Sequence, residues 1–237
     1  MISIVTTSWD DGSILDLKVA ELLDKYGLAG TFYIPRSLFA HPLGNTDVTA
    51  LDSRFEIGAH TLNHVDLTRV SPPEAKEEIE GSKNYLEDLL GHSVPMFCYP
   101  SGKFTRNIKS MVRDSGFVAA RTVNRGNLTL PTDPYEWGVT SYLARGLPHL
   151  NVPSWRKVCD SLRGLHDWEV RARTLFDRFL REGGIYHIWG HSLTFEVELQ
   201  WGKLEKLLAY IANREGICYE TNGEIFTSHY PTANRSN

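Results

Sequence analysis

Two adjacent carboxylates, Asp10 and Asp11, follow a short run of β-branched residues and precede Gly12. Like charges side by side are costly unless each carboxylate has a separate task. A bound metal separates the tasks, because one carboxylate becomes a ligand and the other stays free to accept a proton. The sequence Asp-Asp-Gly-Ser is also ordinary turn chemistry. From this pair alone, two interpretations remain: an ordinary turn, or a site for metal-assisted acid–base chemistry.

A second candidate pair is His60 and His64, which stand four residues apart after another short apolar run. One helical turn brings such positions onto one face, so both imidazoles could bind one cation. Two surface or hydrogen-bonded histidines would show the same spacing. Asp11, at the end of a neighbouring strand, would complete a set of one carboxylate and two histidines. Such a set leaves a coordination position open for water or substrate.

These residues need a fold that gathers the ends of strands. Short β-rich runs are expected to form strands at residues 2–9, 30–34, 55–59, 96–99, 117–121, 138–142, 184–191 and 217–219. Apolar residues at helical spacing predict helices at residues 15–26, 72–90, 107–115, 155–162, 169–181 and 198–213. Residues 36–54 are a loop or a loop with a short helix, residues 144–153 form a Pro/Gly loop, and the tail after residue 230 is polar.

Alternation of strands and helices is typical of an α/β domain with a mainly parallel sheet. Seven to eight such units favour a closed barrel, in which chemistry collects at the carboxyl ends of the strands. The residues at such ends are Asp10, Asp11, His60, Ser101, Arg121 and His191. No break in composition marks a linker, so residues 1–237 are expected to form a single domain.

The composition narrows the classes of function. The chain has 237 residues, of which 41% are hydrophobic and 23% charged, as in a globular protein with a sizeable core. A net charge of −4 without a basic block gives no reason to expect nucleic acid as a partner. No apolar run reaches the roughly 18 residues of a membrane span. The amino terminus lacks a signal-peptide pattern, and three widely spaced cysteines suggest no disulfide framework, so a cytoplasmic location is expected.

The motifs resemble those of the polysaccharide deacetylases with a NodB-type domain, carbohydrate esterase family 4. Residues 8–12 are similar to the pattern Thr-Phe-Asp-Asp-Gly, and residues 60–64 match His-Ser/Thr-x-x-His. Residues 98–102 are similar to Arg-x-Pro-x-Gly, and residues 189–191 resemble Leu-x-His at a strand end. The motifs agree with the family in order and in strand placement. The resemblance implies a distorted (β/α) barrel of seven to eight strands, less regular than a full eightfold one.

The resemblance also implies roles for individual residues. Asp11, His60 and His64 would bind a divalent metal, in this family usually zinc, with cobalt or nickel as alternatives. Asp10 would be the general base, and His191 the general acid that protonates the leaving group.

Other residues would contact the substrate. The backbone N–H of Ser101 would help to hold the oxyanion, and Trp189 would line the pocket for the acyl methyl group. Tyr99 and Arg121 are further candidates to bind substrate.

The chain departs from the family at the third motif, where the family's arginine is Cys98. That arginine normally pairs with the base, and Arg121, at the end of the next strand, could reach Asp10 in its place. The family's fourth motif, which contains an aspartate, has only a weak counterpart in residues 133–137. These departures suggest altered surroundings of the base and admit a changed substrate, such as a small amide.

The function that best fits the sequence is a metal-dependent hydrolase that removes an acyl group, above all N-acetyl, from a sugar or oligosaccharide. One alternative is an amidohydrolase of the same fold that acts on a non-sugar linear or cyclic amide. Another is a barrel that binds carbohydrate without catalysis, which the missing arginine suggests. The expected partner is an acetylated sugar or small amide, with no nucleic acid and no membrane. The sequence does not determine the oligomeric state.

Overall fold

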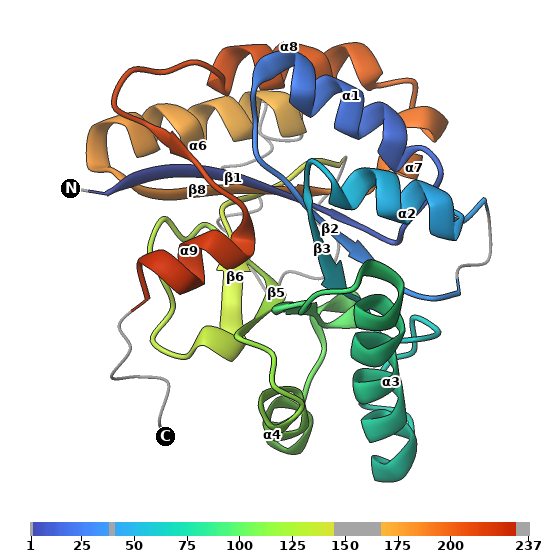
Figure 1. The fold of residues 1–237 in the computed structure, drawn as a ribbon. Helices are drawn as coiled ribbons and strands as arrows, with labels where there is room; N and C mark the ends of the chain where they lie inside the picture. Colours follow the sequence, from blue (N-terminus) through green and yellow to red (C-terminus); the bar gives the residue numbers. More distant parts are fainter. Residues whose placement is uncertain (1, 38–40, 145–166, 231–237) are drawn as a thin grey trace.

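The structure is a computed structural model that describes residues 2–37, 41–144 and 167–230. Its centre is a sheet whose strands follow one another in the order β6-β5-β4-β3-β2-β1-β8-β7, with β9 beside β1. The first and last strands of this order, β6 (Trp137–Val139) and β7 (Ser141–Tyr142), are separated in the chain by a single residue. The two edges of the sheet therefore lie next to each other. The sheet nearly closes on itself, which confirms the expected distorted (β/α) barrel (Figure 1).

The remaining strands are β1 (Ser3–Asp10), β2 (Thr31–Ile34), β3 (Glu56–Ala59), β4 (Met96–Cys98), β5 (Ala119–Arg125), β8 (Gly184–Gly190) and β9 (Cys218–Tyr219). β1 pairs in parallel with β8 along most of its length, with β9 near its start and with β2 near its end. The other pairings of the sheet are parallel too. The carboxyl ends of the strands therefore gather at one end of the barrel.

Thr140 closes the barrel between β6 and β7. β6 pairs with β5 on one side, and β7 pairs with β8 on the other. At the change of partner, the Thr140 N–H donates to the carbonyl of His187 at 2.8 Å, and its hydroxyl donates to the carbonyl of Asn127 at 2.7 Å. Polar groups of the irregular residue are thus satisfied inside the barrel wall.

The helices surround the barrel. They are α1 (Asp16–Tyr26), α2 (Asn45–Asp52), α3 (Pro72–Leu90), α4 (Arg106–Asp114), α6 (Trp168–Glu182), α7 (Ser192–Val197), α8 (Trp201–Ile211) and α9 (Asn222–Ser228). Figure 1 shows α1, α6 and α8 on the side of β1 and β8, and α3 and α4 on the far side. The Ser71 hydroxyl caps α3, which spans the residues expected from the sequence, and Gly91 ends it in a left-handed conformation. No helix of the described ranges is long and apolar enough to span a membrane.

Residues of each strand alternate between the barrel interior and the layer under the helices. Ile4, Met96, Cys98, Ala119 and Ile185 belong to the interior cluster, whereas their strand neighbours pack outward. α9 adds Ile225 and Phe226 to this interior cluster, so it plugs the amino-terminal end of the barrel.

The structure differs from the sequence predictions in several elements. The helix expected at 198–213 begins only at Trp201, after the separate helix α7, whereas residues 36–54 contain the short helix α2, one of the two alternatives that the sequence left open. β5 runs on to Arg125, because it continues to pair with β6. α9 was not predicted, although Thr221 and Glu224 form a capping box at its start. The helix expected at 155–162, Cys159, most of the loop at 144–153 and the tail after residue 230 lie outside the described residues.

Candidate metal and acid–base centre

The end of β1 sends its two carboxylates in different directions. Asp10 is the last residue of the strand and is 3% exposed, since it points into the barrel. Asp11 has a positive φ of 83°, and its N–H donates to the carbonyl of Tyr33 at 3.1 Å. Gly12 follows with φ 63°, where a Cβ atom would come within 2.9 Å of Ile34. This tight turn lifts the Asp11 side chain, 30% exposed, to the mouth of the barrel.

Asp10 is held from below by two donors. The guanidinium of Arg121 forms an ion pair with both of its carboxylate oxygens. The indole N–H of Trp189 donates to Asp10 Oδ2 at 2.8 Å. Burial alone would raise the pKa of Asp10, but the charges of Arg121, His60 and His191 together hold the pKa below its ordinary value. Asp10 is therefore an ionised carboxylate with a fixed orientation.

Arg121 occupies the place that a small residue at position 98 leaves free. Cys98 and Arg121 are paired in register on β4 and β5, and both point inward. The Arg121 guanidinium contacts Cys98 Sγ at 2.7 Å. The expectation that Arg121 reaches Asp10 is thus confirmed. The separate expectation that Arg121 binds substrate is wrong, because its side chain is 0% exposed beneath Asp10.

Asp11 faces three imidazoles at the barrel mouth. Its Oδ1 lies 3.3 Å from His64 Nε2 and 3.7 Å from His60 Nε2, and its Oδ2 lies 3.9 Å from His191 Nε2. Burial alone would raise the pKa of Asp11, but the hydrogen bond with His64 and the charges of His191 and His60 hold it well below its ordinary value. The structure therefore brings the three ligands expected from the sequence together.

The donor set fits a divalent cation. His60 Nδ1 lies 2.8 Å from the carbonyl of Cys98, and a carbonyl only accepts, so this nitrogen carries the proton. Burial lowers the pKa of His60 to about 4, so the ring is neutral and Nε2 presents a lone pair. That lone pair faces Asp11 Oδ1, a buried oxygen 3.7 Å away. Two acceptors directed at each other are stabilised by a cation between them.

A second group of possible ligands, Asp10, His60 and Cys98, lies deeper in the barrel. The guanidinium of Arg121 already contacts both Asp10 and Cys98 there. Burial also raises the pKa of the Cys98 thiol well above its ordinary value, which disfavours the thiolate that a metal or a nucleophilic role requires. The outer group of Asp11, His60 and His64 is therefore the better candidate.

His191 follows β8 directly and stands at the mouth beside Asp11, with its side chain 25% exposed. The hydroxyl of Tyr142 lies 3.4 Å from His191 Nδ1. The ring of Tyr142 also stacks on Trp189, with ring centroids 4.3 Å apart. Because Trp189 in turn binds Asp10, the candidate acid and the candidate base are connected through two packed aromatic rings.

Ser101 and Tyr99 end up in different surroundings. Ser101 is exposed in the turn η1 (Pro100–Gly102) after β4, with a left-handed φ of 57°. Tyr99 points outward from the barrel, is 0% exposed and donates its hydroxyl to the carbonyl of Tyr135 at 3.2 Å. A substrate-binding role for the Tyr99 side chain is therefore wrong. Alternation along β4 is the reason, since Cys98 points inward.

A cavity of about 370 Å³ opens beside the cluster. It is lined by Asp11, His191, Leu193, Thr194, Val197 and Glu198. Leu193 and Val197 are 44% and 74% exposed, so both aliphatic side chains are accessible at this cavity. The cavity thus combines ionisable groups on one side with an aliphatic wall from α7.

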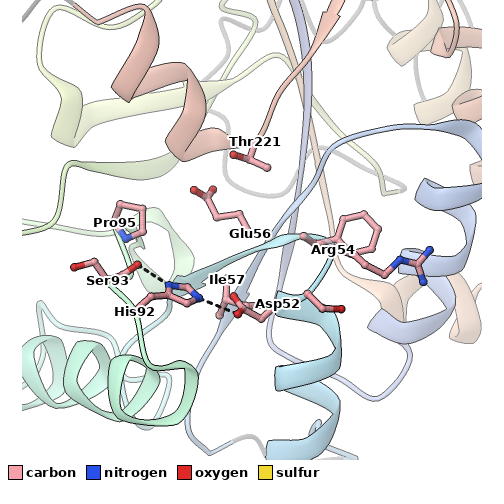
Figure 2. A pocket seen from close by; sticks show the side chains of 10 residues that line it. Asp52, Arg54, Glu56, Ile57, His92, Ser93, Pro95 and Thr221 are labelled. Atoms are coloured by element: carbon pink, nitrogen blue, oxygen red, sulfur yellow. Dashed lines mark hydrogen bonds and ion pairs between the residues drawn. The ribbon is translucent and has the colours of Figure 1, made fainter.

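Another cavity lies at the opposite, amino-terminal end of the strands (Figure 2). Here His92 Nε2 lies 2.8 Å from Asp52 Oδ2. Glu56, at the start of β3, accepts hydrogen bonds from the hydroxyl of Thr31 at 2.6 Å and from the N–H of Gly223 at 3.0 Å. Burial raises the pKa of Glu56 to about 7. These contacts hold α9 against the barrel, which indicates a structural role for Glu56.

Sequence reasoning missed three contacts of the site: the bond from Trp189 to Asp10, the approach of Tyr142 to His191, and the attachment of the loop 60–64 to α3. In the last of these, both carboxylate oxygens of Glu78 accept hydrogen bonds from Asn63. A signal existed for Glu78, since it is a charged residue on the buried face of α3 next to Ile79.

The comparisons with known proteins agree with this geometry. The sequence profile of the family described as polysaccharide deacetylase matches residues 3–120, about half of the chain. YxkH of Bacillus subtilis (strain 168) is 24% identical over 126 residues, which are 52% of this chain and 45% of that protein. The chain thus spans less than half the length of the curated relatives it matches. The chain belongs to the polysaccharide deacetylase family.

Solved structures share the fold at low sequence identity. A Mycobacterium smegmatis protein has a TM-score of 0.70 at 12% identity, over 95% of this chain and 90% of that one. The family 4 carbohydrate esterase of Streptomyces lividans, solved in complex with acetate, has a TM-score of 0.56 at 15% identity, over 91% of each chain. At such identities the likeness concerns the barrel, and the chemistry must be argued from the site.

Proposed function

We propose that this protein is a metal-dependent hydrolase that removes an acyl group, in the first place N-acetyl, from a sugar or oligosaccharide. The observation that supports the proposal most directly is that the two neighbouring carboxylates, Asp10 and Asp11, have different surroundings. Asp10 is fixed by Arg121 and Trp189 inside the barrel, whereas Asp11 faces the nitrogen atoms of His60 and His64. Membership of the polysaccharide deacetylase family supports the same reaction.

Asp11, His60 and His64 would hold the metal ion, for which zinc is the first choice because two imidazoles and a carboxylate suit it. When bound, the ion would polarise the acyl carbonyl and lower the pKa of a water molecule. Loss of any of the three ligands should therefore abolish activity by removing the ion.

Asp10 would accept the proton of the attacking water, since it is ionised and its orientation is fixed. His191, which stands beside Asp11 at the barrel mouth, would donate a proton to the leaving amine or alcohol. The backbone N–H of Ser101, in the left-handed turn after β4, would hydrogen-bond the oxygen on which negative charge develops. Trp189, 6% exposed, would form the floor under the acyl methyl group.

The test combines metal content with acetate release. Protein purified without chelator is analysed for metal, with the His60→Ala/His64→Ala double variant as the control. Acetate release is then measured on a panel of acetylated sugars and small amides with zinc, cobalt or nickel present. We expect about one ion per chain, lost in the control, and turnover of at least one acetylated sugar. Absence of metal from the wild type after soaking with all three ions would overturn the proposal.

A second candidate, an amidohydrolase of the same fold acting on a small non-sugar amide, is favoured by the cavity beside His191. Leu193 and Val197 present an aliphatic wall where the group bonded to the leaving nitrogen would lie. A sugar offers hydroxyl groups there, whereas an alkyl or aryl amide offers apolar surface. Turnover confined to the small amides of the panel would select this candidate.

The third reading, a barrel that binds carbohydrate without catalysis, rested on the missing arginine of the third motif. Arg121 supplies a guanidinium to Asp10 from the neighbouring strand, so the missing arginine no longer argues for a non-catalytic barrel. Saturable sugar binding without turnover in metal-loaded protein would restore it.

A further inference from the structure

The two candidate histidine ligands are anchored very differently. His60 follows β3 directly, is 1% exposed and binds the Cys98 carbonyl through Nδ1 at 2.8 Å. His64 lies four residues further on, in a loop, with its side chain 28% exposed. Its position depends on the backbone conformation of residues 61–64.

That conformation is strained. Thr61 has φ 63° and His64 has φ 52°, so two residues with side chains lie in the left-handed region that favours glycine. Such conformations persist only where the surrounding structure holds them. Something outside the loop must therefore keep His64 in place.

Glu78 of α3 provides this support. Its Oε2 accepts the backbone N–H of Asn63 at 2.8 Å, and its Oε1 accepts the side-chain amide of Asn63 at 2.6 Å. The backbone carbonyl of Glu78 also accepts the N–H of Leu62 at 3.2 Å. The side chain of Glu78 is buried, at 6% exposure for the residue, so its charge is compensated mainly by these donors.

Leu62 packs the same loop onto the same helix. It lies over Gly81, one turn after Glu78, where an added Cβ atom would come within 2.5 Å of Leu62 Cδ1. α3 thus carries both a polar and an apolar contact for residues 62 and 63, directly before His64.

We propose that Glu78 is a positioning residue for the metal centre: through Asn63 it holds His64 in the orientation that binds the ion. The inference rests on the proposed function, since it assumes that Asp11, His60 and His64 bind a metal. Residues that orient metal ligands from outside typically contribute 10–100-fold to metal affinity. Glu78 would do so through the backbone of the neighbouring residue rather than through the imidazole itself.

The test is the zinc dissociation constant of the purified full chain, measured by competition with a chromophoric chelator. Glu78→Gln keeps the size of the side chain but directs an amide N–H₂ at one of the two Asn63 donors. We expect at least a ten-fold weaker zinc dissociation constant with an unchanged circular-dichroism spectrum. The matched control is Glu77→Gln, which removes the same charge from an exposed position one residue away on the same helix, and its zinc affinity should equal that of the wild type.

Asn63→Ala is a second variant in case Glu78→Gln fails to fold. Asn63 is exposed, and the substitution removes the 2.6 Å bond while the backbone N–H bond remains. We expect a several-fold loss of zinc affinity. A purely structural role of Glu78 would lower the melting temperature of the apo and zinc-bound forms alike without changing zinc affinity, and that result would overturn the inference.

Failure of this inference can be told from failure of the proposed function. Wild-type protein that binds zinc, together with Glu78→Gln protein that binds it within two-fold as tightly, would overturn only the role of Glu78. Wild-type protein that binds no metal would overturn both.

Discussion

Replacing Arg121 by methionine removes the cation that faces Asp10 inside the barrel. The two side chains are 0% and 4% exposed. Removing one partner of a buried ion pair costs about 3–5 kcal/mol, because the other charge is left without compensation. Asp10 can avoid this cost by binding a proton, and one pKa unit corresponds to about 1.4 kcal/mol. We therefore expect the pKa of Asp10 to be clearly higher in Arg121→Met than in the wild type.

The direction of the pH effect follows from the proposed role of Asp10 as a base. A base works only when deprotonated, so a higher pKa moves the acidic limb of kcat/KM to higher pH. In the wild type the pKa of Asp10 lies below 3.8, and this carboxylate is ionised throughout the usual assay range. In Arg121→Met, kcat/KM should fall about ten-fold or more at pH 5 relative to the wild type, with a much smaller loss at pH 8.

The substitution should also lower the stability of the fold. A carboxylate whose folded pKa is depressed stabilises the fold above its unfolded pKa, and this contribution is lost as the pH falls through the folded pKa. Arg121→Met should therefore lower the free energy of unfolding at pH 7 by about 3–5 kcal/mol if Asp10 stays ionised, and by less if Asp10 takes up a proton. Urea unfolding at pH 5 and pH 7 measures both cases.

A relocated arginine provides the control. Cys98 and Arg121 face each other in register, so the double variant Cys98→Arg/Arg121→Cys returns a guanidinium to Asp10 from the other strand. In this double variant kcat/KM at pH 5 should return most of the way to the wild-type value. A loss caused by a non-specific packing defect would not be reversed in this way. Arg121→Met protein with the pH profile and urea midpoint of the wild type would refute the reasoning.

Three further predictions concern other groups of the structure. Asp10→Asn should lower acetate release by about 10²–10⁴-fold while metal content by elemental analysis stays at the wild-type level, and full turnover would contradict its role as base. Tyr142→Phe removes the hydroxyl 3.4 Å from His191 and should reduce kcat about two- to ten-fold in steady-state assays, with KM unchanged; a changed KM alone would point to substrate contact instead. Because burial raises the folded pKa of Glu56 from 4.5 to about 7, the folded state binds the extra proton, so stability should fall as the pH rises between these values. The free energy of unfolding from urea titrations should fall between pH 5 and pH 8 by about 1–3 kcal/mol more in the wild type than in Glu56→Gln, and equal decreases would show that Glu56 is not the group responsible.

The sequence predicts the barrel because its signals are local. Runs of β-branched residues, helical spacing of apolar residues and caps such as Ser71 and Gly91 act over a few neighbours in the chain. The same holds for the candidate metal ligands, since parallel strands bring their carboxyl ends together whatever side chains they carry. Asp11, His60 and His64 could therefore be grouped without coordinates.

Tyr99 shows how a local signal can be misused. The family resemblance drew attention to the whole segment after β4, but side chains of a strand alternate. With Cys98 facing inward beside Asp10, Tyr99 had to face the helices. The prediction failed because alternation was not applied, although the sequence already contained it.

The contacts that orient the candidate catalytic groups depend on tertiary structure, and among them only the approach of Arg121 to Asp10 was expected from the sequence. Arg121 meets Asp10 across 111 residues, Trp189 meets Asp10 across 179, and Asn63 meets Glu78 of α3 across 15. Each contact depends on strand register or on how a helix packs, and a shift of one residue would turn the side chain to the other face. Residue types and strand ends thus determined which groups could do chemistry, whereas the register of β4 against β5 and the packing of α3 decided how those groups are held.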